Sequence, residues 1–298
     1  MGIAIKRMAP LKAPGPDGMP PVFYQSFWQN GGPEVSDAIL SCLNSGTLLK
    51  SINHTFITLI PKVCTPESVT EFRTISLCNV LYKIISKVIA NRLKPILNSI
   101  ISEAQNAFIA DRLITDNILI AFESLHYMNS QCSGREGFMA LDMSKAYYRA
   151  EWCFLEKILL HMGFTESWVA MIMQCVSIVT YSILINGEPK GFIRPSRGLR
   201  QGDPLSPFLF LFCAEGLNAL LCKAIEDKEI RGLSLCRQGP RITHLFFADG
   251  CLLFCRSNVV ECPKIQLLLD WYEAALGQQV NKAKTILFFS RNTSAEVQ

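Results

Sequence analysis

The segment FFADGCLLFC, residues 246–255, constrains the fold most, because an Asp-Gly pair joins two runs of apolar residues. Such a pair between strand-forming runs is the strongest short-range signal for a β-hairpin, since a type I′ turn requires positive φ at both central residues. We therefore expect two antiparallel strands, RITHLFFA and CLLFC, with Asp249 and Gly250 in the turn. Two interpretations of Asp249 remain open here: a structural turn residue, or a metal ligand at the hairpin tip.

The rest of the composition indicates a globular protein. Of the 298 residues, 49% are hydrophobic and 18% charged, which is too apolar for a disordered chain. The net charge of +4 is compatible with a polyanionic partner but too small to indicate one alone. The most apolar stretch, residues 207–221, is predicted to be a buried helix, because it is short for a membrane span and contains Glu215.

The cysteines and the N-terminus bear on localisation. Twelve cysteines occur without a CxxC pair, and Cys251, Cys255 and Cys262 with His244 match no zinc-binding pattern. Most cysteines lie in apolar runs, which favours a reducing compartment. We find no signal-peptide pattern at the N-terminus. The expectation is an intracellular protein, nuclear or cytoplasmic, with no signal peptide, no transmembrane segment and no membrane partner.

Secondary-structure signals alternate irregularly along the chain. The Pro- and Gly-rich first 25 residues predict a looped segment. Helices are predicted at 34–43, 81–97, 151–162, 167–177 and from Pro207, and strands at 56–63, 72–77, 138–143 and in TYSILING, which Asn186-Gly187 ends. This order, with one antiparallel pair, predicts an α+β fold with helices packed on one face of a sheet.

Two acids, Asp142 in MALDMSKAY and Asp249 in FFADG, each follow an apolar strand instead of lying in a polar loop. A carboxylate in such a place is costly unless it is paired, solvated or bound to a cation. Two such acids on neighbouring strands repel each other, and divalent metal relieves the repulsion. Two metal ions about 3.5–4 Å apart can clamp the attacking and leaving oxygens of a displacement at phosphorus.

Other residues suit the same chemistry. In GLRQGDPLSP, Gly198 and Gly202 permit unusual backbone, and Gln201 is a polar side chain that could read a templating base pair. Lys62 and Arg73 suit a triphosphate, and Tyr147 would lie beneath the incoming sugar. Taken singly, these are better explained as surface cations, a half-buried aromatic residue and turn glycines. Their order along one chain favours the polymerase interpretation.

The chain resembles the reverse transcriptase domain of non-LTR (long interspersed element type) retrotransposons, particularly those of plant genomes. The resemblance rests on a series of segments in order over about 280 residues: KAPGPDGMPPVFYQ, HTFITLIPK, EFRTISLCNVLYKIISKVIANRLKPIL, AFIADRLITDNILIAFE, MALDMSKAY, YSILINGEPKGFIRPSRGLRQGDPLSPFLFLFCAEGL, ITHLFFADG and GQQVNKAK.

The resemblance implies a right-hand polymerase with fingers and palm, an antiparallel palm sheet backed by helices, and no thumb. It implies an N-terminal loop and leading helix at 1–50, fingers at 51–130 and palm at 131–298, with the reverse transcriptase domain at about 45–298. The implied activity is RNA-directed DNA synthesis on an RNA template and DNA primer with dNTP and two Mg²⁺ ions. By resemblance, Asp142 and Asp249 are catalytic and metal-binding residues. The implied nucleotide-binding residues are Lys62, Arg73, Tyr147, Gln201 and Gly202.

Several residues depart from the family pattern. The family hairpin usually reads Ala-Asp-Asp, and Gly250 replaces the second acid, so we expect weakened metal binding and an impaired polymerase. Tyr148 stands where the family usually has Asp, and Thr74 where it has Pro. The resemblance also leads us to expect that the thumb and the flanking segments of full elements are absent. On this expectation the chain is interpreted as truncated and degenerate, and a catalytically silent nucleic-acid-binding remnant is the alternative.

Overall fold

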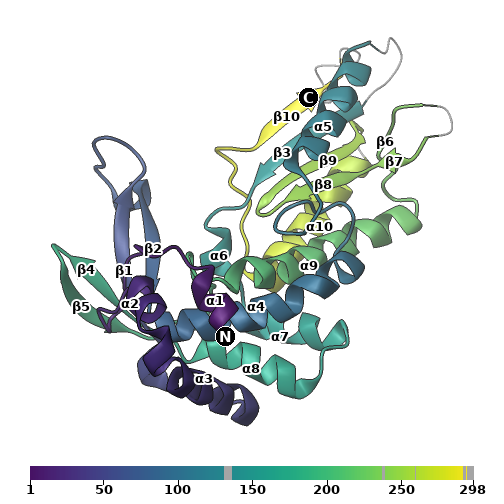
Figure 1. Cartoon of the computed structure of the whole chain (residues 1–298). Coiled ribbons are helices and arrows are strands. Elements are labelled where there is room, and N and C mark those ends of the chain that lie inside the picture. Colours follow the sequence, from purple (N-terminus) through teal and green to yellow (C-terminus); the bar gives the residue numbers. More distant parts are fainter. Residues whose placement is uncertain (131–135, 237–238, 259, 291–292, 294–298) are drawn as a thin grey trace. The chain divides into compact units, whose positions relative to one another are not determined.

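The computed structural model describes residues 1–130, 136–236, 239–258, 260–290 and 293. The chain forms two compact units, each built from two separate stretches of sequence (Figure 1). Unit 1 comprises Met1–Pro95 and Leu155–Leu209, and unit 2 comprises Ile96–Phe154 and Phe210–Gln298. In each unit the four-stranded sheet pairs strands from both of its stretches, so each unit depends on both parts of the chain.

Three helices contain the points where the chain passes from one unit to the other: α4 (Val80–Ile100), α7 (Trp152–His161) and α9 (Ser206–Glu226). α9 extends beyond residues 207–221, which were predicted to be too short for a membrane span, and by length and composition the whole helix could cross a membrane. Most of the helix is nevertheless buried inside the structure, as the predicted core helix should be.

Unit 1 contains a four-stranded sheet in the order β2-β1-β4-β5. The strands of this sheet are β1 (His54–Pro61), β2 (Phe72–Cys78), β4 (Thr180–Ile185) and β5 (Glu188–Ile193). The helices of unit 1, besides those shared with unit 2, are α1 (Gly2–Lys6), α2 (Pro21–Ser26), α3 (Trp28–Ser45), α8 (Glu166–Ser177) and the 3₁₀ helices η1 (Lys50–Asn53) and η2 (Val69–Glu71). β1 pairs antiparallel with β2 and parallel with β4. The predicted Asn186-Gly187 turn is confirmed, since both residues have positive φ and join β4 to β5.

The prediction of a looped N-terminus was partly wrong, because α1 and α2 lie within the first 26 residues. Tertiary contacts explain them: α1 buries Ala4 and Ile5, and the Gln25 amide donates to the carbonyls of Ile5 and Met8, both at 2.9 Å. These two bonds hold α2 against the end of α1.

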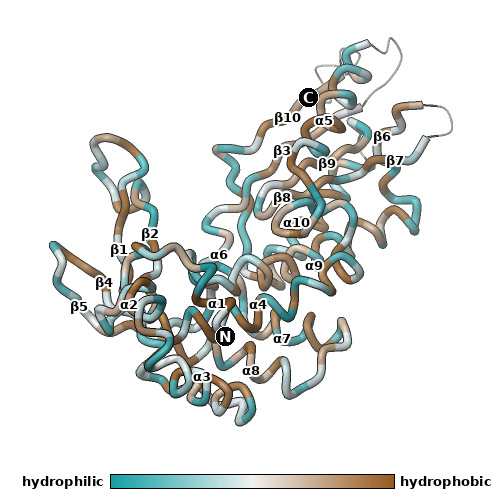
Figure 2. The backbone as a smooth tube through the Cα atoms, in the orientation of Figure 1, coloured by the Kyte–Doolittle hydropathy of each residue, from teal (hydrophilic) through white to brown (hydrophobic). Residues whose placement is uncertain are grey.

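Unit 2 contains an antiparallel sheet in the order β10-β3-β9-β8. Its elements besides α9 are α5 (Ile114–Ser130), α6 (Ala146–Arg149), α10 (Glu261–Leu276), β3 (Glu136–Asp142), β6 (Leu233–Ser234), β7 (Arg241–Ile242), β8 (His244–Phe247), β9 (Gly250–Arg256) and β10 (Ile286–Phe289). Hydrophobic stretches, brown in Figure 2, run along β3, β9 and β10.

Helices cover both faces of this sheet, not one face as predicted. Leu252 and Phe254 of β9 pack with Met128 of α5. The alternate residue Cys251 lines a cavity of about 10 Å³ with Tyr272 of α10 and Phe210 of α9. Successive strand residues point to opposite faces, so the unbroken apolar run of β9 requires cover on both sides.

The β8–β9 hairpin is confirmed, but its turn is centred one residue earlier than predicted. Phe247 pairs with Gly250, so Ala248 and Asp249 are the two loop residues. Positive φ occurs at Ala248 (55°) and not at Asp249 or Gly250, which excludes the type I′ turn. Gly250 is therefore the first residue of β9, in ordinary backbone conformation.

Candidate active site

The site begins where β3 ends beside the β8–β9 hairpin. Asp142 is the last residue of β3, and its partner in the antiparallel register is Gly250. Asp249 immediately precedes Gly250 in the hairpin turn. Two acids distant in sequence are thus brought to the same end of adjacent strands, as the sequence predicted.

Gln105, which precedes α5, and Asn117 of α5 hold the hairpin tip in place. Gln105 forms a parallel bridge with Phe246 along the outer edge of β8. The Gln105 Oε1 accepts a hydrogen bond from the Ala248 N–H at 3.1 Å, and Asn117 Nδ2 donates to the Phe246 carbonyl at 2.9 Å. Gln105 and Asn117 are both buried, so these bonds fix the tip that carries Asp249.

Asp142 has two polar partners from the segment before β10. Lys284 Nζ lies 3.2 Å from Asp142 Oδ2, and Asn281 Nδ2 donates to the same oxygen at 3.2 Å. The Asn281 N–H also donates to the Asp142 carbonyl at 2.8 Å. Lys284 and Asn281 were not predicted as site residues, although both belong to GQQVNKAK; their spacing of three residues in that segment was the available signal.

Asp142, Asp249 and Tyr147 interact electrostatically, and these interactions affect the pKa values of Asp249 and Tyr147. Burial raises the pKa of Asp249, and the negative charge of Asp142 raises it further. Burial likewise raises the pKa of Tyr147, with a further contribution from Asp249. The Tyr147 ring, carried by α6, stacks on Phe210 with centroids 5.1 Å apart and planes 14° apart. Asp142, Asp249 and Tyr147 thus form one cluster in unit 2.

Asp142 and Asp249 offer two carboxylates to a magnesium ion, which is fewer than three protein ligands. In the part of the chain that the structure describes, no group of three or more His, Cys, Asp or Glu residues could hold a metal ion. The two carboxylates do offer the oxygen ligands that Mg²⁺ prefers, and Mg²⁺ is commonly bound by one or two carboxylates together with substrate phosphates. A dication would also relieve the repulsion that raises the pKa of Asp249.

The other four predicted residues lie in unit 1, along β1 and β2. Lys62 follows β1, where its N–H donates to the Glu71 carbonyl at 2.8 Å and its Nζ to the Thr70 carbonyl at 2.9 Å. Arg73 is exposed on β2 opposite Ile60. The Gln201 carbonyl accepts from the Ser76 N–H of β2 at 2.9 Å. The seven residues therefore form two groups, one in each unit.

The backbone conformation at position 202 requires glycine. Its φ is +110°, a region that L side chains rarely adopt, and a Cβ there would lie 3.2 Å from the Ser76 carbonyl oxygen. The interpretation of GLRQGDPLSP as a loop shaped by glycine is therefore correct at this position. Because Gln201 and Gly202 contact β2, this loop packs against the strand that carries Arg73.

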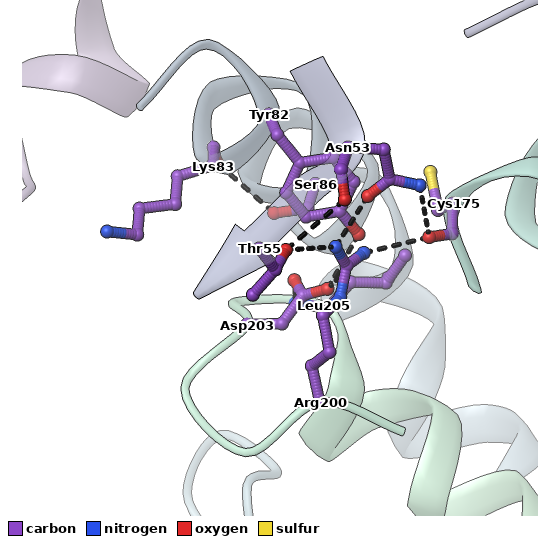
Figure 3. A network of polar contacts seen from close by, with 9 residues as sticks. All are labelled: Asn53, Thr55, Tyr82, Lys83, Ser86, Cys175, Arg200, Asp203 and Leu205. Carbon is purple, nitrogen blue, oxygen red and sulfur yellow. Dashed lines mark hydrogen bonds and ion pairs between the residues drawn. The ribbon is translucent and has the colours of Figure 1, made fainter. Parts of the chain in front are cut away.

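A buried polar network supports this loop (Figure 3). Arg200 Nη2 lies 3.1 Å from Asp203 Oδ2, and both side chains are at most 2% exposed. The Tyr82 hydroxyl donates to Asp203 at 2.6 Å, and Arg200 donates to the Asn53 side chain and, at 2.8 Å, to the Cys175 carbonyl. The guanidinium also lies 3.8 Å from the centroid of the Tyr82 ring.

Arg200 and Asp203 were not predicted as functional residues, although they flank Gln201 and Gly202 in the same segment. Two opposite charges three residues apart, directly flanking the Gln-Gly pair, were the available signal. Their side chains make bonds to η1, α4 and α8 and hold both ends of the Gln201–Gly202 turn. They act on the loop through its backbone and do not line a site themselves.

Comparison with known proteins gives a consistent picture. Residues 60–296 match the family model described as "Reverse transcriptase (RNA-dependent DNA polymerase)". The "Transposon TX1 uncharacterized 149 kDa protein" of Xenopus laevis is 28% identical over 283 residues, covering 95% of this chain and 21% of that protein. The "Retrovirus-related Pol polyprotein from type-2 retrotransposable element R2DM" of Drosophila melanogaster is 28% identical over 266 residues, covering 89% and 23%.

A third relative is shorter and more similar. The "Uncharacterized mitochondrial protein AtMg01250" of Arabidopsis thaliana is 53% identical over 66 residues, 22% of this chain and 54% of that protein. Among solved structures, telomerase from Candida Tropicalis in complex with a TWJ fragment of telomeric RNA gives a TM-score of 0.57 at 13% identity, covering 91% of this chain and 46% of that one. This likeness shows the fold. The chain spans about a fifth to a quarter of the length of the Xenopus and Drosophila relatives.

Proposed function

Since the chain belongs to the reverse transcriptase (RNA-dependent DNA polymerase) family, we propose that it extends a DNA primer on an RNA template as part of a non-LTR retrotransposon protein. The transposon relatives and the telomerase-like fold support this proposal. The observation that carries it is the pairing of β3 with the β8–β9 hairpin, which sets Asp142 beside Asp249.

We further propose that the element is of plant type. The support is the similarity to the Arabidopsis thaliana protein, which at 53% identity over 66 residues exceeds the 28% found for the animal relatives. Intracellular localisation, nuclear or cytoplasmic, remains part of the same proposal, because the substrates of such a protein are nucleic acids.

The residues take complementary roles in this proposal. Asp142 and Asp249 would hold Mg²⁺, which reverse transcriptases generally use and which supplies positive charge to the reacting phosphate oxygens when bound. Tyr147 would border the sugar of the incoming dNTP, its ring held by Phe210. Lys62 and Arg73 would bind the triphosphate, while Gln201 and Gly202 would contact the template base pair.

We propose that activity is impaired. Gly250 occupies the position of the second hairpin acid, so two protein carboxylates remain to balance two metal ions and a triphosphate. Loss of even an outer ligand-supporting residue at a metal site costs about 10–100-fold in affinity or activity. Binding of the second Mg²⁺ should therefore be weak.

A primer-extension assay tests the proposal. Purified protein is given an RNA template, an annealed DNA primer, dNTP and Mg²⁺, and is compared with an Asp249→Asn variant of the same size. The proposal expects slow extension by the natural chain and none by the variant. Equal extension by both proteins would exclude Asp249 as a catalytic metal ligand.

A catalytically silent nucleic-acid-binding remnant is the second candidate, and Gly250 is the observation that favours it. Calorimetry separates the two. A polymerase should bind Mg²⁺ and dNTP in a coupled manner, whereas a silent remnant should bind RNA without any metal-dependent uptake of nucleotide.

A further inference from the structure

A cavity of about 440 Å³ lies in unit 1, and none of the seven predicted site residues lines it. It forms where β1 and β4 begin side by side, since His54 pairs with Thr180 in parallel register. η1 leads into β1 at this point and contributes Lys50, and the end of β5 contributes Phe192 with the following Arg194. Elements from distant parts of the chain therefore build one concave surface.

The charge of the cavity is positive. Lys50 and Arg194 line it from different elements, and of the described residues that line it none is acidic. Within the part of the chain that the structure covers, neither cation has a carboxylate within ion-pair distance. The Cys175 carbonyl near the end of α8 already accepts bonds from Asn53 and Arg200, which offsets the negative end of that helix. Such a cavity attracts an anion.

An aromatic surface adjoins these cations. The Phe192 side chain is 63% exposed, and its ring stacks near that of His54 with centroids 5.9 Å apart and planes 15° apart. The Arg194 guanidinium lies 5.6 Å from the Phe192 centroid. A hydrogen bond of 2.8 Å between His54 Nδ1 and Thr180 Oγ1 fixes the His54 ring. Burial lowers the pKa of His54, so at neutral pH the ring serves as an uncharged platform.

We propose that this cavity binds single-stranded nucleic acid without sequence preference, with a phosphate between Lys50 and Arg194 and the neighbouring base against Phe192. Paired cations next to an exposed aromatic ring suit a phosphate and a base that are adjacent in one strand. The site contains none of the seven residues assigned to catalysis. It depends on the proposed function only for the choice of RNA as the probe.

Fluorescence anisotropy with a labelled oligouridylate in EDTA tests whether the charges of Lys50 and Arg194 contribute to binding. Lys50→Gln/Arg194→Gln should weaken binding about tenfold and reduce the slope of log affinity against log salt by about 0.7, since the two cations share one phosphate and each single-strand phosphate contact contributes about 0.7. The matched control is Arg7→Gln/Lys157→Gln, which removes the same charge from exposed residues of the same unit. An equal loss in both double variants would overturn the site.

Phe192→Leu tests the base contact. It should weaken oligouridylate binding at least about fivefold, because stacking on an aromatic side chain contributes that much per base. It should leave the affinity for an abasic oligomer unchanged. If inorganic polyphosphate competes as well as oligouridylate and Phe192→Leu has no effect, the cavity recognises phosphate alone and the proposal is overturned. Because EDTA removes the metal ions that DNA synthesis would require, these binding measurements test the cavity independently of polymerase activity.

Discussion

Asp142 of β3 lies directly opposite Gly250 of β9 in the antiparallel pairing of the two strands. Directly opposed residues share one face of a sheet, with Cβ atoms about 4.5–5.5 Å apart. A carboxylate at position 250 would therefore lie beside that of Asp142. Gly250 is therefore the immediate cross-strand neighbour of a proposed metal ligand.

Gly250→Asp should increase Mg²⁺ affinity at least about tenfold, because it adds a third carboxylate to the site. The backbone permits the change, since Gly250 has no positive φ and its nearest contact to a new Cβ, the Phe247 carbonyl oxygen, is at 3.4 Å. Isothermal titration with Mg²⁺ measures the effect, and primer extension should rise with it. Gly250→Asn is the uncharged control; equal Mg²⁺ affinity of the two variants would contradict the prediction.

The same pair of variants should differ in stability. Without metal, Gly250→Asp sets two like charges opposite each other, so it should unfold at lower urea concentration than Gly250→Asn by up to about 1 kcal/mol. Mg²⁺ should reverse that order, since a ligand stabilises the folded state that binds it. If Mg²⁺ shifts both unfolding curves equally, position 250 does not contribute to a metal site.

Arg200→Met should lower the free energy of unfolding by about 3–5 kcal/mol, because it leaves the buried carboxylate of Asp203 without its counter-charge. Urea denaturation measures this loss. Lys190→Met is the matched control: its ion pair with Glu188 is exposed and should contribute less than about 1 kcal/mol. Arg200→Met/Asp203→Asn should recover part of the loss, and no recovery would indicate that the loss comes from packing instead.

Gly202→Ala should destabilise the protein by about 1–3 kcal/mol, since it imposes a φ of +110° on a residue with a Cβ. Gly31→Ala provides the contrast. Gly31 lies in α3 with no atom within 4 Å of a new Cβ, so alanine should stabilise by about 0.5–1 kcal/mol. Thermal unfolding of the two variants should shift in opposite directions; shifts of the same sign would contradict the backbone argument.

Stability should fall as the pH falls from about 6.5 to about 4, partly through His244. Burial lowers the pKa of His244 to about 4, while in the unfolded chain the pKa is about 6.5. Between these values the unfolded state binds the additional proton, so acid favours unfolding by a few kcal/mol at most. His244 Nε2 is hydrogen-bonded to Asn218 Oδ1 at 2.8 Å, and a Gln side chain can donate to the same oxygen.

His244→Gln isolates this contribution. Glu215 is linked to His244 through Asn218, and burial raises the pKa of Glu215, so Glu215 opposes the trend by favouring the folded state as the pH falls. The difference between the unfolding curves of the natural chain and His244→Gln cancels the Glu215 effect. Above pH 6.5 the difference in the free energy of unfolding should stay at its neutral-pH value, and below pH 6.5 it should change as the natural chain loses stability. A pH-independent difference would exclude His244.

Local patterns predicted the elements well. The apolar runs around residues 56–63, 72–77 and 138–143 are strands, and the Asn186-Gly187 turn follows from the φ preferences of its two residues. The β8–β9 turn was placed one residue late, because the register of strands packed on both faces determined the loop residues. The same double burial explains why helices cover both faces of the unit 2 sheet.

The family, the hairpin and the position of Asp142 and Asp249 at the ends of apolar strands could be predicted from the amino-acid sequence, because these depend on neighbouring residues and on the order of motifs. Three features became known from the three-dimensional structure: Asp142 opposes Gly250, β1 runs parallel to β4, and the Arg200–Asp203 pair that flanks Gln201 and Gly202 is buried. Strand register and buried ion pairs join residues far apart in the chain. They depend on how side chains fill both faces of a sheet, and local sequence spacing does not determine that.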